Sequence, residues 1–251
     1  MQDTYIGDEG KGFPLVLLHG FLGSSKMWKP QIDFFKDHFR VITPDLPGFG
    51  KSNKVKLYNS IQSISDLILE RLEEKKINKF HLLGHSMGGM IVQEMAKKQG
   101  DKISKLICYS TGPIGEMPGR FETVDESREN LKKKGLEIMA KNIAKTWFVE
   151  QDKAKYFNIC IQAGKQASIE AVDSSLIAFK NWNGVDTLKK IKNETLIIWG
   201  DKDKSYNFEQ IQTLKKNIAN SKLVIFKNCA HNVHLEKVEQ FNKIIFDFIK
   251  E

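Results

Sequence analysis

The stretch GHSMGG at residues 84–89 follows directly on an apolar run, KFHLL at residues 79–83, and opens a helical pattern, GGMIVQEMAKKQ. A strand that runs straight into G-x-S-x-G and then into a helix is the nucleophile-elbow pattern. Glycines flank the serine because side chains at Gly84 and Gly88 would crowd a tight turn and its neighbouring strands. The turn lifts the serine hydroxyl above the sheet, and the N-terminal N–H groups of the helix point to the same place. The pattern therefore predicts a serine nucleophile at Ser86.

Short apolar runs alternate with helical patterns along the chain, which is typical of an α/β fold. Helices are expected at residues 60–75 and 236–250, where apolar residues recur every three or four positions. Such alternation predicts a mostly parallel, twisted sheet with helices on both faces. Six runs are expected to be buried strands: FPLVLL (13–18), FRVIT (39–43), KFHLL (79–83), KLICYS (105–110), TLIIW (195–199) and KLVIF (222–226).

The alternation stops between the strands expected at 105–110 and 195–199. The intervening segment is too long for one crossover, and a structureless loop of that length would be unusual in a compact domain. Residues 125–148 and 168–180 carry apolar side chains at helical spacing. We therefore predict two units, an α/β core formed by residues 1–112 and 191–251 and a helical cap, or lid, formed by residues 113–190.

Composition restricts the partners and the location of the protein. The formal net charge is +8, but the lysines are spread along the chain and no arginine-rich patch is visible, which argues against nucleic acid. No apolar run approaches the roughly 20 residues of a membrane span, and MQDTYIGDEG lacks the features of a secretory signal. The spacing of the cysteines predicts neither disulfides nor a metal site. We expect a cytoplasmic protein without membrane or nucleic-acid partners that acts on a small molecule as a monomer or homodimer.

A serine hydroxyl is a weak nucleophile that needs a base oriented by a third group. In a strand–elbow–helix protein of this kind the chain order is serine, then an acid, then histidine. The acid should follow the strand TLIIW, where GDKDKSY supplies Asp201 and Asp203. The base should follow KLVIF, where KNCAHNVHLEK supplies His231 and His234. The chain order alone does not decide between Asp201 and Asp203 as the acid, or between His231 and His234 as the base.

Five stretches resemble the α/β-hydrolase superfamily, and in particular its small capped serine esterases and lactonase-like members, including 3-oxoadipate enol-lactonase relatives. The resemblance implies that Asp203 is the acid, since it lies three residues after Gly200, and that His231 is the base. Ala230 stands where the family usually has glycine. The resemblance also implies a cap inserted after the sixth core strand. The stretches are LLHGFLGS (17–24), PDLPGFGKS (44–52), GHSMGG (84–89), WGDKD (199–203) and CAHNVHLEK (229–237).

Acyl transfer builds negative charge on the former carbonyl oxygen, and preorganised N–H groups stabilise it. The backbone N–H of Met87, directly after the nucleophile, should be one donor. The resemblance implies Phe21, in the loop after the first expected strand, as the other. We expect an apolar substrate pocket lined by Phe21, Met117, Trp147, Phe148 and Trp182.

Several other polar residues are expected to be structural. His19 should shape the oxyanion loop, and His85 should point away from the base. Asp45 should order its own loop. Cys160 lacks an elbow and a nearby base, so it is a poor alternative nucleophile. For Arg120 and Arg128 in the expected cap, a surface role is favoured over a role as a carboxylate anchor.

The residue at the elbow limits the chemistry. Haloalkane dehalogenases and epoxide hydrolases resemble this architecture but need a carboxylate there, whereas this chain has Ser86. We expect hydrolysis of a small carboxylic ester or lactone through an acyl-enzyme, without a metal or organic cofactor. Three alternatives remain: carbon–carbon bond hydrolysis of a ring-cleavage product, a lyase or acyl-transfer reaction on the same triad, and a non-catalytic ligand-binding protein.

Overall fold

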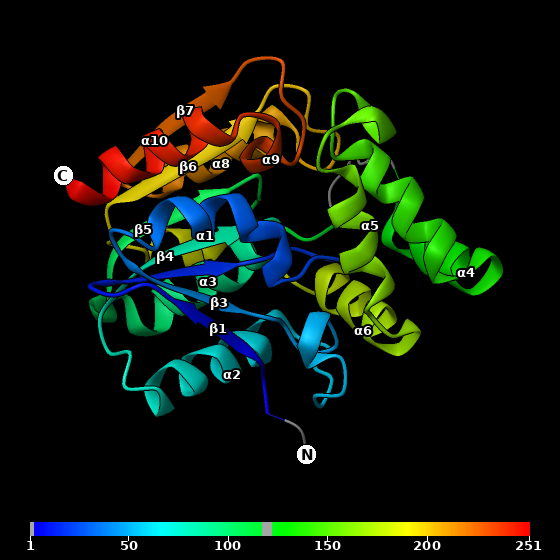
Figure 1. Cartoon of the computed structure of the whole chain (residues 1–251), viewed down its shortest axis with the longest axis horizontal. Coiled ribbons are helices and arrows are strands. Elements are labelled where there is room, and N and C mark those ends of the chain that lie inside the picture. The colour runs from blue at the N-terminus through cyan, green and yellow to red at the C-terminus, as the bar shows by residue number, and fades with distance from the viewer. Residues whose placement is uncertain (1–2, 117–121) are drawn as a thin grey trace.

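The computed structural model describes residues 3–116 and 122–251. Within them, seven strands form one sheet in the order β1-β3-β2-β4-β5-β6-β7, and only the β1–β3 pair is antiparallel. The predicted mostly parallel sheet is thus confirmed (Figure 1). The strands are β1 (Ile6–Glu9), β2 (Pro14–Leu18), β3 (Arg40–Pro44), β4 (Phe80–His85), β5 (Ile103–Tyr109), β6 (Thr195–Gly200) and β7 (Ser221–Phe226).

Helices cover both faces of the sheet because successive strand residues point to opposite sides. Leu15 and Leu17 of β2 pack in one apolar cluster with residues of α1 (Lys29–Phe35) and α10 (Val238–Lys250). Val16 and Leu18, the alternate residues, belong to a second cluster on the other face. That cluster contains residues of α2 (Ile61–Glu74), α3 (Met87–Gln99) and α8 (Phe208–Asn217). The sheet therefore has a separate core on each side, which makes it a rigid base for the loops at its edge.

A helical insertion joins β5 to β6, and Figure 1 shows α4, α5 and α6 gathered to one side of the sheet. The resemblance implied that the cap follows the sixth core strand. This number is wrong, because five strands, β1 to β5, precede the insertion within the described residues. Gly135, with φ 79° and ψ 166°, divides α4 into two helical pieces. The helices are α4 (Val124–Thr146), α5 (Phe157–Lys165), α6 (Ile169–Lys180) and α7 (Val185–Leu188).

The two ends of the insertion lie side by side. Ile114 and Asn183 form an antiparallel bridge, and the N–H of Gly115 donates to the carbonyl of Trp182 at 3.0 Å. The indole N–H of Trp182 donates to the Glu94 carboxylate at 3.0 Å, and this carboxylate is buried in the middle of α3. The insertion is therefore attached to the helix that begins at the elbow.

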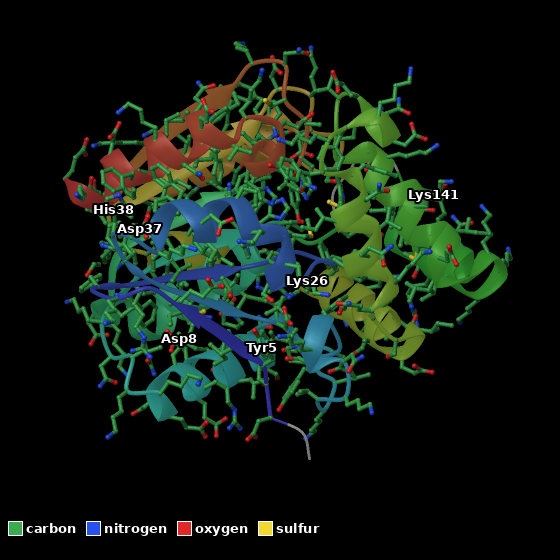
Figure 2. All side chains as sticks on the ribbon, viewed as in Figure 1. Tyr5, Asp8, Lys26, Asp37, His38 and Lys141 are labelled. Carbon is green, nitrogen blue, oxygen red and sulfur yellow. The ribbon has the colours of Figure 1, made fainter. Side chains whose placement is uncertain are left out.

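Lys26 and Lys141 are both exposed, and Figure 2 shows their side chains on the surface. In the described part of the chain, no helix combines the length and the hydropathy needed to cross a bilayer. Cys108, Cys160 and Cys229 are all buried free thiols.

Candidate active site

Ser86 occupies the turn between β4 and α3 in a conformation that L-residues rarely adopt. Its φ is 57° and its ψ is −117°, outside the regions that ordinary side chains favour. Two contacts hold the turn: the Ser86 N–H donates to the carbonyl of Tyr109 at 3.0 Å, and the Thr111 hydroxyl donates to the Ser86 carbonyl at 2.8 Å. Strained backbone of this kind persists only where the surroundings determine it and is concentrated at functional sites.

The glycines around Ser86 are required by close approach of backbone. A Cβ on Gly84 would lie 2.2 Å from the carbonyl oxygen of Gly88. A Cβ on Gly88 would lie 2.5 Å from the carbonyl oxygen of Leu18 in β2. Both distances are shorter than real Cβ atoms tolerate, so the elbow can form against its neighbouring strand only with glycine at these two positions.

Asp203 and His231 meet at the same edge of the sheet although 28 residues separate them. Asp203 follows β6 and His231 follows β7, and the His231 Nδ1 lies 2.9 Å from the Asp203 Oδ2. The other carboxylate oxygen accepts the N–H groups of Ser205 at 2.7 Å and Tyr206 at 3.2 Å. Because an ionised carboxylate only accepts hydrogen bonds, Nδ1 carries the proton and Nε2 is left to accept one.

Ser86 and His231 line one small cavity of about 20 Å³. A volume of that order holds a single water molecule. Phe21 and Trp147, two of the expected pocket residues, also line it. The remaining lining residues are Gly115, Ile143, Phe179, Ser205 and Tyr206.

Two other expected pocket residues, Phe148 and Trp182, lie elsewhere. Phe148 packs against Phe157 of the insertion, with ring centroids 6.3 Å apart. Trp182 directs its indole N–H to Glu94, at the base of the insertion. Neither is among the residues that line the cavity. Met117 lies outside the described residues.

The loop after β2 is shaped by His19. The N–H of Leu46 donates to the His19 Nε2 at 2.9 Å, so the proton is on Nδ1, which donates to the Gly20 carbonyl at 2.8 Å. Burial lowers the pKa of His19 and keeps it neutral. A Cβ on Gly20 would lie 2.8 Å from the Ser86 Cβ, so the peptide before Phe21 runs beside the serine. The geometry matches the structural role expected for His19.

The matching family model is described as alpha/beta hydrolase fold and covers residues 14–238. The chain belongs to this family. The hydrolase is 29% identical to the pimeloyl-[acyl-carrier protein] methyl ester esterase of Legionella pneumophila (strain Corby), over 99% of this chain and 100% of the relative. It is 28% identical to the 2-hydroxy-6-oxononadienedioate/2-hydroxy-6-oxononatrienedioate hydrolase of Burkholderia vietnamiensis (strain G4 / LMG 22486), over 99% and 90%.

A solved structure, an esterase from Exiguobacterium antarcticum, superposes on the hydrolase with a TM-score of 0.92 at 27% identity, covering 99% of this chain and 96% of that one. Together with the named esterase relative, this similarity supports an esterase-type hydrolase. Within the residues that the structure describes, no three His, Cys, Asp or Glu side chains converge in a way that could hold a metal ion.

Asp201 and His234, the alternative acid and the alternative base from the sequence, make structural contacts in the hydrolase. The Asp201 carboxylate accepts the N–H of Asn228 at 2.7 Å and closes the loop beside β6. The His234 Nδ1 lies 3.0 Å from the Tyr109 hydroxyl, and its ring packs on Trp28 with centroids 4.6 Å apart. Neither side chain is among the described residues that line the cavity.

His85 and Asp45 also have structural contacts. The expectation that His85 points away from the base is wrong, because its ring centroid lies 4.5 Å from that of His231. The His85 ring also stacks on Tyr109 at 4.6 Å between centroids, and burial holds its pKa well below the ordinary value. The Asp45 carboxylate accepts the N–H groups of Ser25 at 2.6 Å and Lys51 at 2.8 Å, which orders the loop after β3.

Cys160 and Arg128 of the insertion have partners that fit a structural role. The Asn232 amide donates to the Cys160 sulfur at 3.4 Å, and burial raises the pKa of this thiol. A thiol with a raised pKa is a poor nucleophile. The Arg128 guanidinium forms a bidentate pair with Asp173, at 2.7 and 3.0 Å. Arg120 lies outside the described residues.

Buried His234 makes stability depend on pH. Burial lowers its pKa to about 3, whereas the ordinary value is about 6.5. The unfolded chain therefore takes up a proton that the fold excludes as pH falls below about 6.5, and by pH 5 this costs about 2 kcal/mol of unfolding free energy. In His234→Gln the part of the pH-dependent loss of unfolding free energy that comes from this histidine should disappear. Denaturant unfolding at pH 7 and pH 5 measures this change in unfolding free energy, and His38→Gln, at an exposed histidine, is the control. If His234→Gln lost as much unfolding free energy between the two pH values as wild type does, the prediction would be contradicted.

Proposed function

We propose that this hydrolase cleaves a small carboxylic ester or lactone with Ser86 as nucleophile, His231 as base and Asp203 as the acid that orients it. One observation carries the proposal: the His231 imidazole, paired with the Asp203 carboxylate, lines the same cavity as the strained Ser86. A serine on an elbow beside an oriented imidazole is the arrangement that acyl transfer requires.

The reaction proceeds in two halves. The His231 Nε2 takes the Ser86 proton while the serine oxygen attacks the acyl carbon, and the backbone N–H groups of Phe21 and Met87 stabilise the oxyanion. Met87 is the first residue of α3, so its N–H has no partner within the helix. The imidazolium protonates the leaving alcohol, and an acyl-enzyme remains. Water attacks the acyl-enzyme with His231 again as base, while Asp203 keeps the proton on Nδ1.

Two esterases among the compared proteins support ester hydrolysis. A second candidate reaction is supported by the relative named as a 2-hydroxy-6-oxononadienedioate hydrolase. In that reaction the same triad would hydrolyse a carbon–carbon bond of a ring-cleavage dienoate. The nearly equal identities, 29% and 28%, do not favour one reaction over the other.

A substrate panel distinguishes the two reactions. Short and medium acyl p-nitrophenyl esters and lactones should be turned over, and a ring-cleavage dienoate should show no loss of its chromophore. A fluorophosphonate probe should label the wild-type protein at Ser86. Turnover of the dienoate alone would favour the second candidate, and inertness to every acyl donor and to the probe would contradict a serine hydrolase.

We also propose that residues 113–190 act as a cap that sets substrate size. The cavity of about 20 Å³ is closed by insertion residues, including Ile143, Trp147 and Phe179. Because this volume accepts only a water molecule, an acyl chain enters when the insertion moves or when its side chains turn. We further propose a small acyl compound as the substrate and the cytoplasm as the location, which three free thiols support.

Trp147→Ala should shift the acyl-length preference toward longer chains. Removing the indole enlarges the cavity at the point where an acyl chain would extend, so kcat/KM for an octanoyl ester should rise about tenfold relative to an acetyl ester. Phe157→Ala is the matched control, since it empties space inside the insertion at a buried residue outside the cavity lining. An unchanged preference in Trp147→Ala would remove Trp147 from the acyl pocket.

A further inference from the structure

The segment that carries His231 has no regular structure of its own. It lies between β7 and the short helix α9 (Val233–Glu236). A base on an irregular segment keeps its position only if neighbouring groups hold the backbone, because catalysis is sensitive to displacements of about 1 Å. The contacts of the residues before and after His231 therefore decide how well the imidazole is placed.

The core holds the carbonyl group of His231. The Tyr109 hydroxyl, at the end of β5, donates to this oxygen at 2.9 Å. The His85 Nε2, at the end of β4, lies 3.3 Å from it. Both groups belong to the sheet and neither touches the insertion through this contact, so they fix His231 relative to Ser86.

Glu236 holds the other side of the segment and also contacts the insertion. One of its carboxylate oxygens accepts the N–H of Ala230, directly before His231, at 2.6 Å. The other accepts the N–H of Val149, in the insertion, at 2.7 Å. Burial raises the pKa of Glu236, so its partly buried carboxylate is kept at an energetic cost. Hydrogen bonds from backbone N–H groups to a carboxylate are among the stronger ones in proteins.

A second contact joins the same two segments. The N–H of Asn232, directly after His231, donates to the carbonyl of Trp147 at 3.0 Å. The Trp147 indole lines the cavity, and its centroid lies 6.2 Å from that of the His231 ring. Residues on both sides of the base are thus tied to the stretch of the insertion that carries a wall of the cavity.

From these contacts we infer that Glu236 is a positioning residue that couples the alignment of the base to the seating of the Trp147 wall of the cavity. The inference rests on the proposed function, since it gives Glu236 a role through His231. A single carboxylate bridges the N–H before the base and the N–H two residues after Trp147. When the insertion is seated, the base is aligned; when it lifts, the constraint on Ala230 is released with it.

Glu236→Gln tests the inference because glutamine keeps the size of the side chain. Its amide offers one oxygen and one NH2 group, so one of the two backbone N–H groups would face a donor. We expect kcat to fall about 10- to 100-fold and KM for a short acyl ester to rise several-fold, since both the base and the wall lose their alignment. Glu239→Gln, an exposed glutamate in α10, is the matched control and should stay within about twofold of wild type.

Hydrogen exchange gives a local readout. In Glu236→Gln, the backbone amide of Ala230 or Val149 that faces the new NH2 group should lose protection by about tenfold, because it loses its acceptor. In a double-mutant cycle with Trp147→Ala, the effects on kcat/KM should fall short of multiplicative by about fivefold or more. Multiplicative effects, or a lower Tm with kcat and KM within twofold of wild type, would overturn the inference.

The proposed function and the inference fail in different ways. If wild type does not react with a fluorophosphonate, the proposed function is overturned, and the exchange of Ala230 and Val149 then decides the bridge by itself. If wild type reacts and Glu236→Gln reacts at the same rate with unchanged exchange at both amides, the bridge is overturned and the proposed function stands.

Discussion

Ser86→Ala should lower kcat for ester hydrolysis by about 10⁴- to 10⁶-fold, because the residual rate of a triad enzyme without its nucleophile comes only from binding and the oxyanion donors. The side chain lies on a turn with φ 57°, and alanine tolerates this turn no worse than serine does. The expected loss is therefore chemical, with little change in stability. Steady-state hydrolysis of a p-nitrophenyl ester, with Tm measured on the same samples, checks it.

Ser205→Ala is the informative comparison for Ser86→Ala. Ser205 lines the same cavity, but its contact with the triad is through its backbone N–H, which donates to Asp203. Loss of its hydroxyl should cost less than about tenfold, since the N–H remains. Turnover retained in Ser86→Ala, after contaminating esterase has been excluded by probe labelling, would reject Ser86 as the nucleophile.

Asp203→Asn should lower kcat by about 10⁴-fold, because an amide can present its NH2 group to His231 and favour the wrong tautomer. The effect should appear in kcat more than in KM, since Asp203 is absent from the described residues that line the cavity. Stopped-flow acylation by a p-nitrophenyl ester measures the step directly.

Asp201→Asn is the matched control, two residues away on the same loop. Its carboxylate accepts one N–H, from Asn228, and asparagine keeps an oxygen that can do the same. We expect less than a tenfold change in kcat. A larger loss in Asp201→Asn than in Asp203→Asn would reassign the acid of the triad.

The strands of the core could be predicted because each is a short apolar run, and β4 and β6 are buried along their whole length. The run at 195–199 became β6 (Thr195–Gly200), and the run at 79–83 became β4 (Phe80–His85). The strand β1 (Ile6–Glu9) could not be, since IGDE is short, mostly polar and half-exposed at the sheet edge. Its pairing with β3 depends on backbone hydrogen bonds, and these produce no periodic pattern of apolar residues in the sequence from which a strand could be predicted.

The helical insertion was predicted, and the break inside α4 was not. In residues 125–148 the apolar side chains at helical spacing, Leu136, Met139, Ile143 and Trp147, all follow Gly135, so their pattern gives no sign of a break at this glycine. A glycine inside a helical pattern is ordinarily only a modest cost. Gly135 has a φ of 79°, a backbone conformation that the apolar pattern does not indicate.

The candidate site, like the fold, could be predicted only in part. Asp203 and His231 follow from strand ends and a family pattern, because the carboxyl ends of neighbouring parallel strands meet at one edge. The cavity wall does not, since Ile143 and Phe179 come from helices whose orientation over the sheet has no local signal. Trp182 is an example of what the sequence could not decide. As an aromatic residue of the insertion it was expected in the pocket, but its indole N–H donates to the buried Glu94 carboxylate on α3.

The paired ends of the insertion bear on how such proteins diversify. Ile114 and Asn183 form a bridge, so the insertion leaves the core and returns to it at one point. For the core, the insertion is equivalent to a closed loop. Doubling the length of a closed loop costs only about 0.6 kcal/mol of entropy. The segment can therefore be lengthened, shortened or exchanged over generations while the elbow, β6 and β7 keep their places. New substrate preferences can arise by remodelling one appendage, with the inherited reaction left intact beneath it.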